Sequence, residues 1–153
     1  LPKINFHLYG NQNTIHEKKI IKLKNVYFKG YLEYSKLVLI MNNYKILLMP
    51  YKKNVGVLIK NINVAKYFSP LKMFDYLASG KIIIASNLSV YKNILINKVN
   101  SIVINDDVNQ WSKMINKALN TNKYDYLGKA ARIDSKKFSW RNRIIKIMEF
   151  QNI

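Results

Sequence analysis

The sequence predicts an α/β fold, a Rossmann-like parallel sheet with helices on both faces. Short β-rich runs alternate with longer runs of helical spacing along the chain. This alternation is typical of βαβ units, in which a crossover helix returns the chain to a parallel strand. Apolar residues make up 49% of the 153 residues, enough for a domain with its own core. Residues 1–153 show no internal repeat and no linker, so we expect them to form a single domain.

Five strands are expected, and the first three end in a residue that turns the chain. Gly10 and Gly30 follow the first two strands, and Pro50 follows the third. Ligands of open α/β sheets bind beyond the carboxyl ends of the strands, so each position could allow close backbone approach to a ligand. Ordinary loop residues would give the same pattern at any one of them. The expected strands are residues 4–9, 25–29, 46–49, 81–85 and 101–104.

Seven helices are expected between and after these strands. The helix at 71–79 is closed by Gly80, a typical C-terminal cap. The connection at 51–68, before this helix, is long, because loops between a strand and a helix usually have about 2–6 residues. We therefore expect a binding loop or lid there. The expected helices are residues 15–22, 34–42, 71–79, 90–96, 108–119, 124–137 and 141–150.

The start of the helix at 71–79 has the features of an anion site. Ser69 is a favourable N-cap, and Pro70 is a favourable first helical residue. Free backbone N–H groups at such a helix start bind phosphate well. Lys72 opposes the helix dipole there by about 0.3–1 kcal/mol, and a bound phosphate would reverse this cost.

Asp75 lies on the same side of the helix as Lys72, and Leu71, Phe74 and Ala78 are expected to form the buried face. The two charged residues could instead pair on a solvated face, which would stabilise the helix by only about 0.2–0.5 kcal/mol. Spacing alone favours neither a ligand site nor such a pair.

The chain is strongly basic, with a formal net charge of +18. Such a charge suits a nucleic acid or an anionic membrane surface. Lysines make up nearly all of the basic residues and are scattered along the chain, which is also typical of a biased amino-acid composition. We therefore expect no nucleic-acid partner, and a peripheral contact with the inner membrane face is the favoured use of the charge.

Several chemistries are not favoured by the sequence. There is no cysteine, which excludes thiolate metal sites and is typical of the cytoplasm. The two histidines, His7 and His16, have no partner spacing for a metal site. No dinucleotide-binding glycine motif or P-loop is present. We expect a cytoplasmic protein without a metal or another cofactor.

The segment 69–80 and the apolar strand after it resemble a sequence signature of the retaining glycosyltransferases of family four, or group one, which use nucleotide sugars. The run Asp75-Tyr76-Leu77-Ala78-Ser79-Gly80 fits the second half of that motif. Residues 25–30, 46–50 and 138–140 resemble further family segments in the same order. The resemblance extends over almost the whole chain.

The resemblance implies the nucleotide-sugar-binding, C-terminal domain of a GT-B fold. Transfer in the family retains the sugar's configuration and generally needs no metal. By resemblance, Asp75 binds the ribose hydroxyls, the backbone before it meets the phosphates and sugar, and Gly30 with Tyr31 meets the base. No catalytic residue is identified. The candidate donor-binding residues are Gly30, Tyr31, Pro50, Ser69, Pro70, Leu71, Lys72 and Asp75.

The sequence departs from the family pattern at three positions, one of which, Ile82 in place of the usual proline, is expected to be harmless. Asp75 stands where glutamate is usual, and Tyr67 stands where the family has an acid that contacts the donor sugar. The family's domain also opens with a further strand and helix, preceded by an acceptor-binding domain. We expect these parts to be missing, so that residues 1–153 alone are inactive.

The favoured function is transfer of a sugar from a nucleoside-diphosphate sugar to a glycan or lipid-linked acceptor. The alternatives are a non-catalytic or degenerate nucleotide-sugar-binding module, a GT-B nucleotide-sugar epimerase and a basic nucleic-acid binder.

Overall fold

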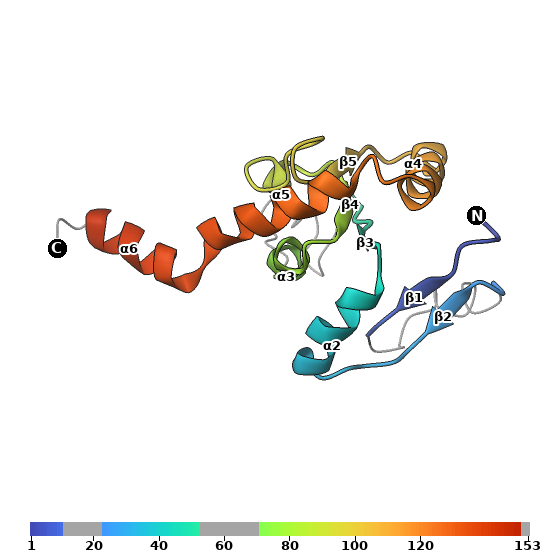
Figure 1. Cartoon of the computed structure of the whole chain (residues 1–153), viewed down its shortest axis with the longest axis horizontal. Helices are drawn as coiled ribbons and strands as arrows, with labels where there is room; N and C mark the ends of the chain where they lie inside the picture. Colours follow the sequence, from blue (N-terminus) through green and yellow to red (C-terminus); the bar gives the residue numbers. More distant parts are fainter. Residues whose placement is uncertain (11–22, 53–70, 151–153) are drawn as a thin grey trace, which may run out of the picture. The chain divides into compact units, whose positions relative to one another are not determined.

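The computed structural model describes residues 1–10, 23–52 and 71–150, and the chain forms two compact units, residues 1–40 and 41–153 (Figure 1). The expected helix at 15–22 and most of the connection at 51–68 lie outside the described residues.

The first unit contains a two-stranded parallel sheet. Strand β1 (Phe6–Leu8) pairs with β2 (Val26–Phe28), and helix α2 (Tyr34–Ile40) follows. The Asn25 side chain donates hydrogen bonds to the carbonyl oxygens of Leu1 and Ile4, at 3.0 and 2.7 Å. Gly10 donates its backbone N–H to the Gly30 carbonyl at 3.0 Å, so both expected strand-ending glycines lie at the same end of this sheet.

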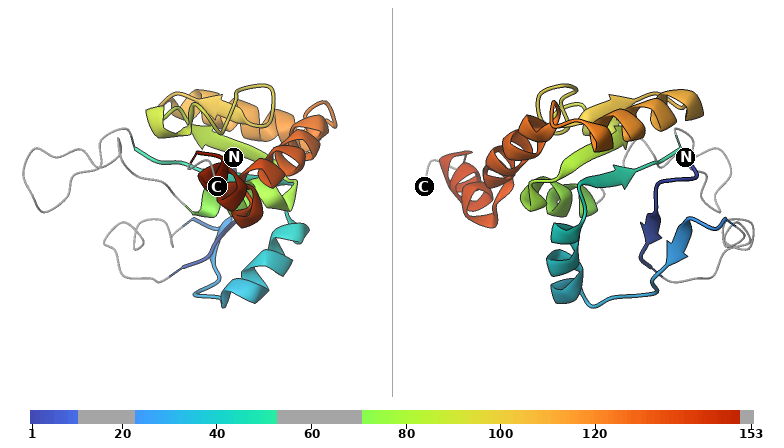
Figure 2. Two further views of the ribbon diagram at one scale, coloured as in Figure 1. Left: turned by 90° about the vertical axis from the view of Figure 1, so that its left-hand side faces the viewer. Right: turned by 45° about the vertical axis from the view of Figure 1, so that its right-hand side comes forward.

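The second unit contains a three-stranded parallel sheet in the order β3-β4-β5 (Figure 2). All five residues of the central strand β4 are buried, as expected for a strand covered on both faces. Parallel strands with helices on both sides confirm the Rossmann-like class, although the described strands form two sheets. The elements are β3 (Ile46–Met49), β4 (Ile82–Ser86), β5 (Ile102–Ile104), α3 (Lys72–Ser79), α4 (Val108–Asn120), α5 (Asp125–Ser135), α6 (Trp140–Phe150) and the 3₁₀ turns η1 (Met41–Asn43), η3 (Ser89–Tyr91) and η4 (Lys136–Phe138).

Helix α3 ends at Gly80, as the sequence predicts. Gly80 is left-handed, with φ 69°, and its N–H donates to the Leu77 carbonyl at 3.2 Å. The buried face of α3 differs from the expected one: Met73 and Leu77 are buried, Phe74 is half-buried, and Leu71 and Ala78 are exposed. The predicted face was wrong because Met73 and Leu77 pack in the buried cluster with Met49 of β3, Ile83 of β4 and Ala131 of α5.

Helices α3 and α5 approach each other very closely at two glycines. A Cβ atom on Gly128 of α5 would overlap the Gly80 carbonyl oxygen and would lie 3.2 Å from the Lys81 carbonyl carbon. The backbone of α5 therefore packs directly on the turn that joins α3 to β4.

Lys45 joins β3 to the end of α4. Its Nζ atom donates to the carbonyl oxygens of Leu119 and Thr121, at 3.1 and 3.2 Å, and to the Asn122 side chain at 3.3 Å. The last carbonyls of a helix lack partners within the helix and carry partial negative charge, so a lysine there is favourable.

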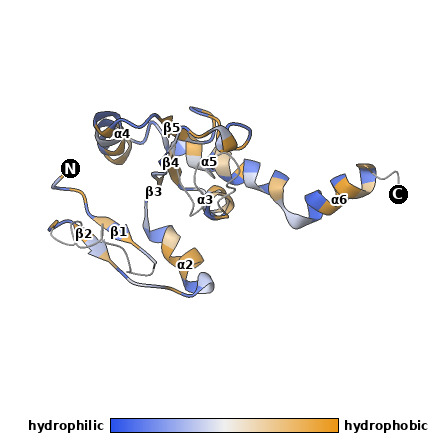
Figure 3. Ribbon diagram, turned by 180° about the vertical axis from the view of Figure 1, so that it is seen from behind, coloured by the Kyte–Doolittle hydropathy of each residue, from blue (hydrophilic) through white to orange (hydrophobic). Residues whose placement is uncertain are grey.

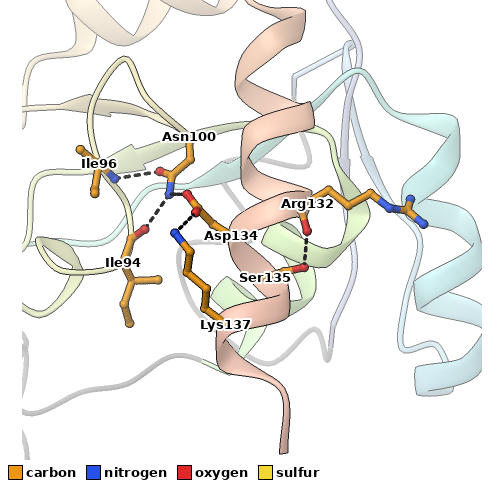
Figure 4. A network of polar contacts seen from close by, with 7 residues as sticks. All are labelled: Ile94, Ile96, Asn100, Arg132, Asp134, Ser135 and Lys137. Atoms are coloured by element: carbon orange, nitrogen blue, oxygen red, sulfur yellow. Dashed lines mark hydrogen bonds and ion pairs between the residues drawn. The ribbon is translucent and has the colours of Figure 1, made fainter. Parts of the chain in front are cut away.

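Asn100 organises the connection between β4 and β5 (Figure 4). This side chain is 1% exposed, accepts from the Ile96 N–H at 2.8 Å and donates to the Ile94 carbonyl at 2.9 Å. It also donates to Asp134 of α5 at 2.9 Å, and Asp134 accepts a second bond from Lys137 at 2.6 Å.

The predicted α-helix at 90–96 was wrong, because the Asn100 side chain binds the backbone of this segment. The chain forms the short turn η3 and then non-helical turns. The Asn100 side chain accepts from the Ile96 N–H, which a continuous helix would direct to the Lys92 carbonyl.

Helix α6 has no buried residue, and apolar and polar side chains alternate along it (Figure 3). Among the described residues, no helix has the length and apolar character needed to span a bilayer. The exposed apolar side chains of α6 are Trp140, Ile144, Ile145, Ile147, Met148 and Phe150.

Candidate donor-binding site

The carboxyl end of β3 leads directly to an aromatic residue beside α3. Pro50 follows β3 and is exposed, and the Tyr51 N–H donates to the Met49 carbonyl at 3.1 Å, which turns the chain there. The Tyr51 ring packs against the buried cluster that contains Met49, Met73 and Tyr91. Tyr51 therefore joins the end of β3 to the first turn of α3.

Lys72, the first residue of α3, is exposed and lies over this ring. Its Nζ atom is 5.4 Å from the centre of the Tyr51 ring, within the range of a cation–π contact. Leu71 before it has helical dihedral angles and is 79% exposed, so the helix start is on the surface of its unit. Ser69 and Pro70 lie outside the described residues.

Asp75 is half-buried in α3, next to Tyr76. Burial raises the pKa of Tyr76, and the nearby Tyr51 and Asp75 raise it further. The electrostatic effect places Tyr51, Asp75 and Tyr76 in one neighbourhood. Tyr76 thus lies near both Asp75 and Tyr51, and Lys72 lies over the Tyr51 ring.

Tyr91 lies in the turn that follows β4. Its side chain is 1% exposed, and its hydroxyl has no hydrogen-bond partner among the described residues. Burial, with a further contribution from Tyr51, raises the pKa of Tyr91 to about 12.

The remaining candidates, Gly30 and Tyr31, belong to the unit of residues 1–40. Gly30 has φ 71°, and a Cβ atom there would meet nothing within 4 Å. Tyr31 is 73% exposed. Pro50, Leu71, Lys72 and Asp75 belong to the unit of residues 41–153.

Tyr51 and Tyr91 were missed as candidates from the sequence, because tyrosines at apolar spacing are typical of a core. For Tyr51 a signal was present: it comes directly after Pro50, at a strand's carboxyl end, where ligands bind in α/β sheets. For Tyr91 the sequence offers no comparable signal.

No group of three or more histidine, cysteine, aspartate or glutamate side chains that could hold a metal occurs within residues 1–10, 23–52 and 71–150.

Comparisons with known proteins bear on both the fold and the family. The chain resembles the solved structure of sucrose-phosphate synthase from Thermosynechococcus elongatus, with a TM-score of 0.71 and 16% sequence identity. The match covers 95% of this chain and 37% of that protein, so the chain spans little more than a third of its length. No curated protein matches the chain. A family of glycosyl transferase-like proteins matches over residues 1–149, and the chain belongs to this family.

Proposed function

We propose that residues 1–153 are the donor-binding domain of a retaining glycosyltransferase of the family-four type. The full protein would transfer a sugar from a nucleoside-diphosphate sugar to a glycan or lipid-linked acceptor. Family membership, the Rossmann-like fold, the contact of Lys72 with Tyr51 and the position of Asp75 in the first turn of α3 support the proposal. Acceptor binding is assigned to a further domain outside these residues.

The position of Lys72 at the exposed start of α3 carries the proposal. The donor's pyrophosphate would bind at this helix start, where the dipole and the Lys72 ammonium both favour negative charge. Asp75, one turn further on, would accept hydrogen bonds from the ribose hydroxyls. Pro50 would fix the turn beside the phosphates.

In the proposed reaction the bond between the sugar's anomeric carbon and the phosphate oxygen breaks. The nucleoside diphosphate leaves with the bonding electrons, the acceptor's hydroxyl oxygen bonds to the anomeric carbon, and its proton passes to the leaving diphosphate. Negative charge grows on the leaving phosphate, so a fixed cation such as Lys72 stabilises the transition state more than the bound substrate. The reaction as proposed uses no metal or other cofactor.

Calorimetric titration of the chain with UDP, GDP and ADP tests the proposal. One diphosphate is expected to bind, and chelation of divalent metals with EDTA should not change its affinity. Asp75→Asn is expected to weaken this binding by about 1.5–3 kcal/mol, as for a lost hydrogen bond to a charged group. Asp125→Asn, an exposed change at the start of α5, is the matched control and should leave the affinity unchanged.

Two other results would contradict the proposal. A folded chain that binds none of the three diphosphates would favour the degenerate or accessory module. Binding of nucleic acid that falls steeply with salt, without nucleotide selectivity, would favour the basic nucleic-acid binder. Product analysis with the full protein separates transfer to an acceptor from epimerisation of the donor.

A further inference from the structure

The hydroxyl of Tyr91 is a buried polar group that no described residue binds. The residue is 1% exposed, and its hydroxyl oxygen has no hydrogen-bond partner among the described residues. Leaving such a group unpaired is costly, and the great majority of buried polar atoms in folded proteins have a partner. The cost is understandable if a ligand supplies the partner.

The surroundings of this hydroxyl point to the donor site. Tyr91 follows β4, and Tyr51 follows the neighbouring strand β3, so both residues lie at the carboxyl edge of the same parallel sheet. Tyr51 packs against the cluster that contains Tyr91 and acts electrostatically on its hydroxyl. Tyr51 is also in contact with Lys72, whose Nζ atom lies 5.4 Å from the centre of the Tyr51 ring. The order is therefore Lys72, Tyr51, Tyr91, from the helix surface inwards.

We propose that the Tyr91 hydroxyl is a donor-binding group that donates a hydrogen bond to a phosphate or sugar oxygen of the nucleoside-diphosphate sugar. The inference rests on the proposed function and adds a residue to its site. Every phosphate and sugar oxygen can accept a hydrogen bond, so either could meet a phenol at this edge.

The protonation state of Tyr91 suits this role. A pKa of about 12 keeps the hydroxyl protonated throughout the physiological range, so it presents a neutral O–H to the ligand. A neutral donor adds no charge beside the Lys72 ammonium. Tyr91 would thus select ligands with an oxygen atom placed to accept its hydrogen bond, while Lys72 would attract the negative charge of the phosphates.

The Tyr91→Phe variant removes only the hydroxyl and separates a binding role from a structural one. If the hydroxyl is unpartnered in the free protein, its removal leaves the Tm unchanged or raises it, because a desolvation cost disappears. The affinity for the bound diphosphate or its sugar derivative is expected to fall about three- to tenfold, the loss of one ordinary hydrogen bond.

Tyr126→Phe is the matched control. The Tyr126 hydroxyl donates to the Lys98 carbonyl at 3.0 Å, at a distance in sequence from the candidate site. Its removal should lower the Tm slightly and leave the affinity unchanged, the reverse of the result expected for Tyr91→Phe.

Titrations with the nucleoside monophosphate, diphosphate and sugar diphosphate identify the accepting oxygen. A loss already present with the monophosphate or diphosphate assigns a phosphate oxygen. A loss seen only with the sugar diphosphate assigns a sugar oxygen. Either result supports the proposal.

Three results would overturn it. A lowered Tm for Tyr91→Phe would mean that the hydroxyl has a structural partner. Unchanged affinity in Tyr91→Phe, with Asp75→Asn still weakened, would overturn this inference and leave the proposed function intact. A wild-type chain that binds none of the three ligands would overturn both.

Discussion

At the scale of single residues, Asp134 shows how a charged side chain supports a buried amide. Hydrogen bonds from Lys137 and Asn100 lower the pKa of Asp134, and the Lys137 charge adds to this effect, while burial acts in the opposite direction. Asn100 thereby gains an ionised acceptor, and charge-assisted hydrogen bonds are stronger than neutral ones.

This shift makes the stability of the chain depend on pH. Because the folded pKa lies below the unfolded value of 3.8, the contribution of Asp134 is full above that value and is lost as the pH falls through the folded pKa. Asp134→Asn should lower the free energy of unfolding at pH 7 by about 0.5–1.5 kcal/mol. The difference from wild type should shrink as the pH falls below about 4. Urea unfolding across this pH range measures both effects.

Asp106→Asn is the control for this measurement, because Asp106 is exposed in the loop after β5. It should reproduce neither the loss at pH 7 nor the convergence in acid. An Asp134→Asn difference that stayed constant from neutral to acid pH would contradict the role of the Asp134 charge.

At the scale of secondary-structure elements, the contact between α3 and α5 depends on the absence of a side chain. A Cβ atom at Gly128 meets backbone, which cannot rotate away as a side chain can: the Gly80 carbonyl and the Lys81 carbonyl carbon at 3.2 Å. Gly80 is itself fixed by its left-handed conformation, φ 69°. A methyl group at position 128 therefore requires α5 or the turn after α3 to move.

Gly128→Ala should therefore destabilise the chain although alanine is the better helix former. Alanine gains about 1 kcal/mol in a helix interior. Overpacking costs about 1–3 kcal/mol, and an overlap with backbone belongs at the upper end of that range, so a net loss of about 1–2 kcal/mol is expected. Thermal or urea unfolding measures it.

Lys129→Ala on the same helix is the matched control. Lys129 is exposed, so the change should alter stability by no more than about 0.5 kcal/mol. A Gly128→Ala variant as stable as wild type would mean that α3 and α5 are farther apart than described.

At the scale of the whole molecule, the sequence predicted the elements that local patterns determine. Strand β3 has the expected bounds because an apolar run ends at Pro50. Helix α3 ends before Gly80, because this glycine adopts the left-handed conformation that is typical of a helix C-terminal cap. Helix α4 begins at Val108, as expected, where the Asp107 side chain accepts from the N–H groups of Asn109 and Gln110.

The features that the sequence did not predict depend on contacts distant along the chain. The helix expected at 90–96 is absent because Asn100 bonds its backbone, and Asn100 is held in turn by Asp134. The buried residues of α3 pack with Ile83 of β4 and Ala131 of α5, which both come later in the chain. Neither the hydrogen bonds of Asn100 nor the packing of α3 can be predicted from the spacing of apolar residues.

The candidate site was predicted in part for a similar reason. Lys72 and Asp75 follow from helix position, and the structure places Lys72 over the Tyr51 ring and Asp75 beside Tyr76. Their assignment to the donor stays a prediction. Tyr51 and Tyr91 became candidates only when neighbouring strands brought them to one sheet edge, a pairing that no local pattern encodes.

The exposed apolar side chains of α6 have a consequence for how the protein behaves as a colloid. In dilute buffer, a formal net charge of +18 keeps copies of the chain apart. Added salt shortens the range of that repulsion, from about 10 Å at 0.1 M to about 3 Å at 1 M, and leaves apolar attraction in place. Ile144, Ile147 and Phe150 would then meet their counterparts on other copies. We therefore expect the chain to stay dispersed at low ionic strength and to associate, not to become more soluble, when salt is added.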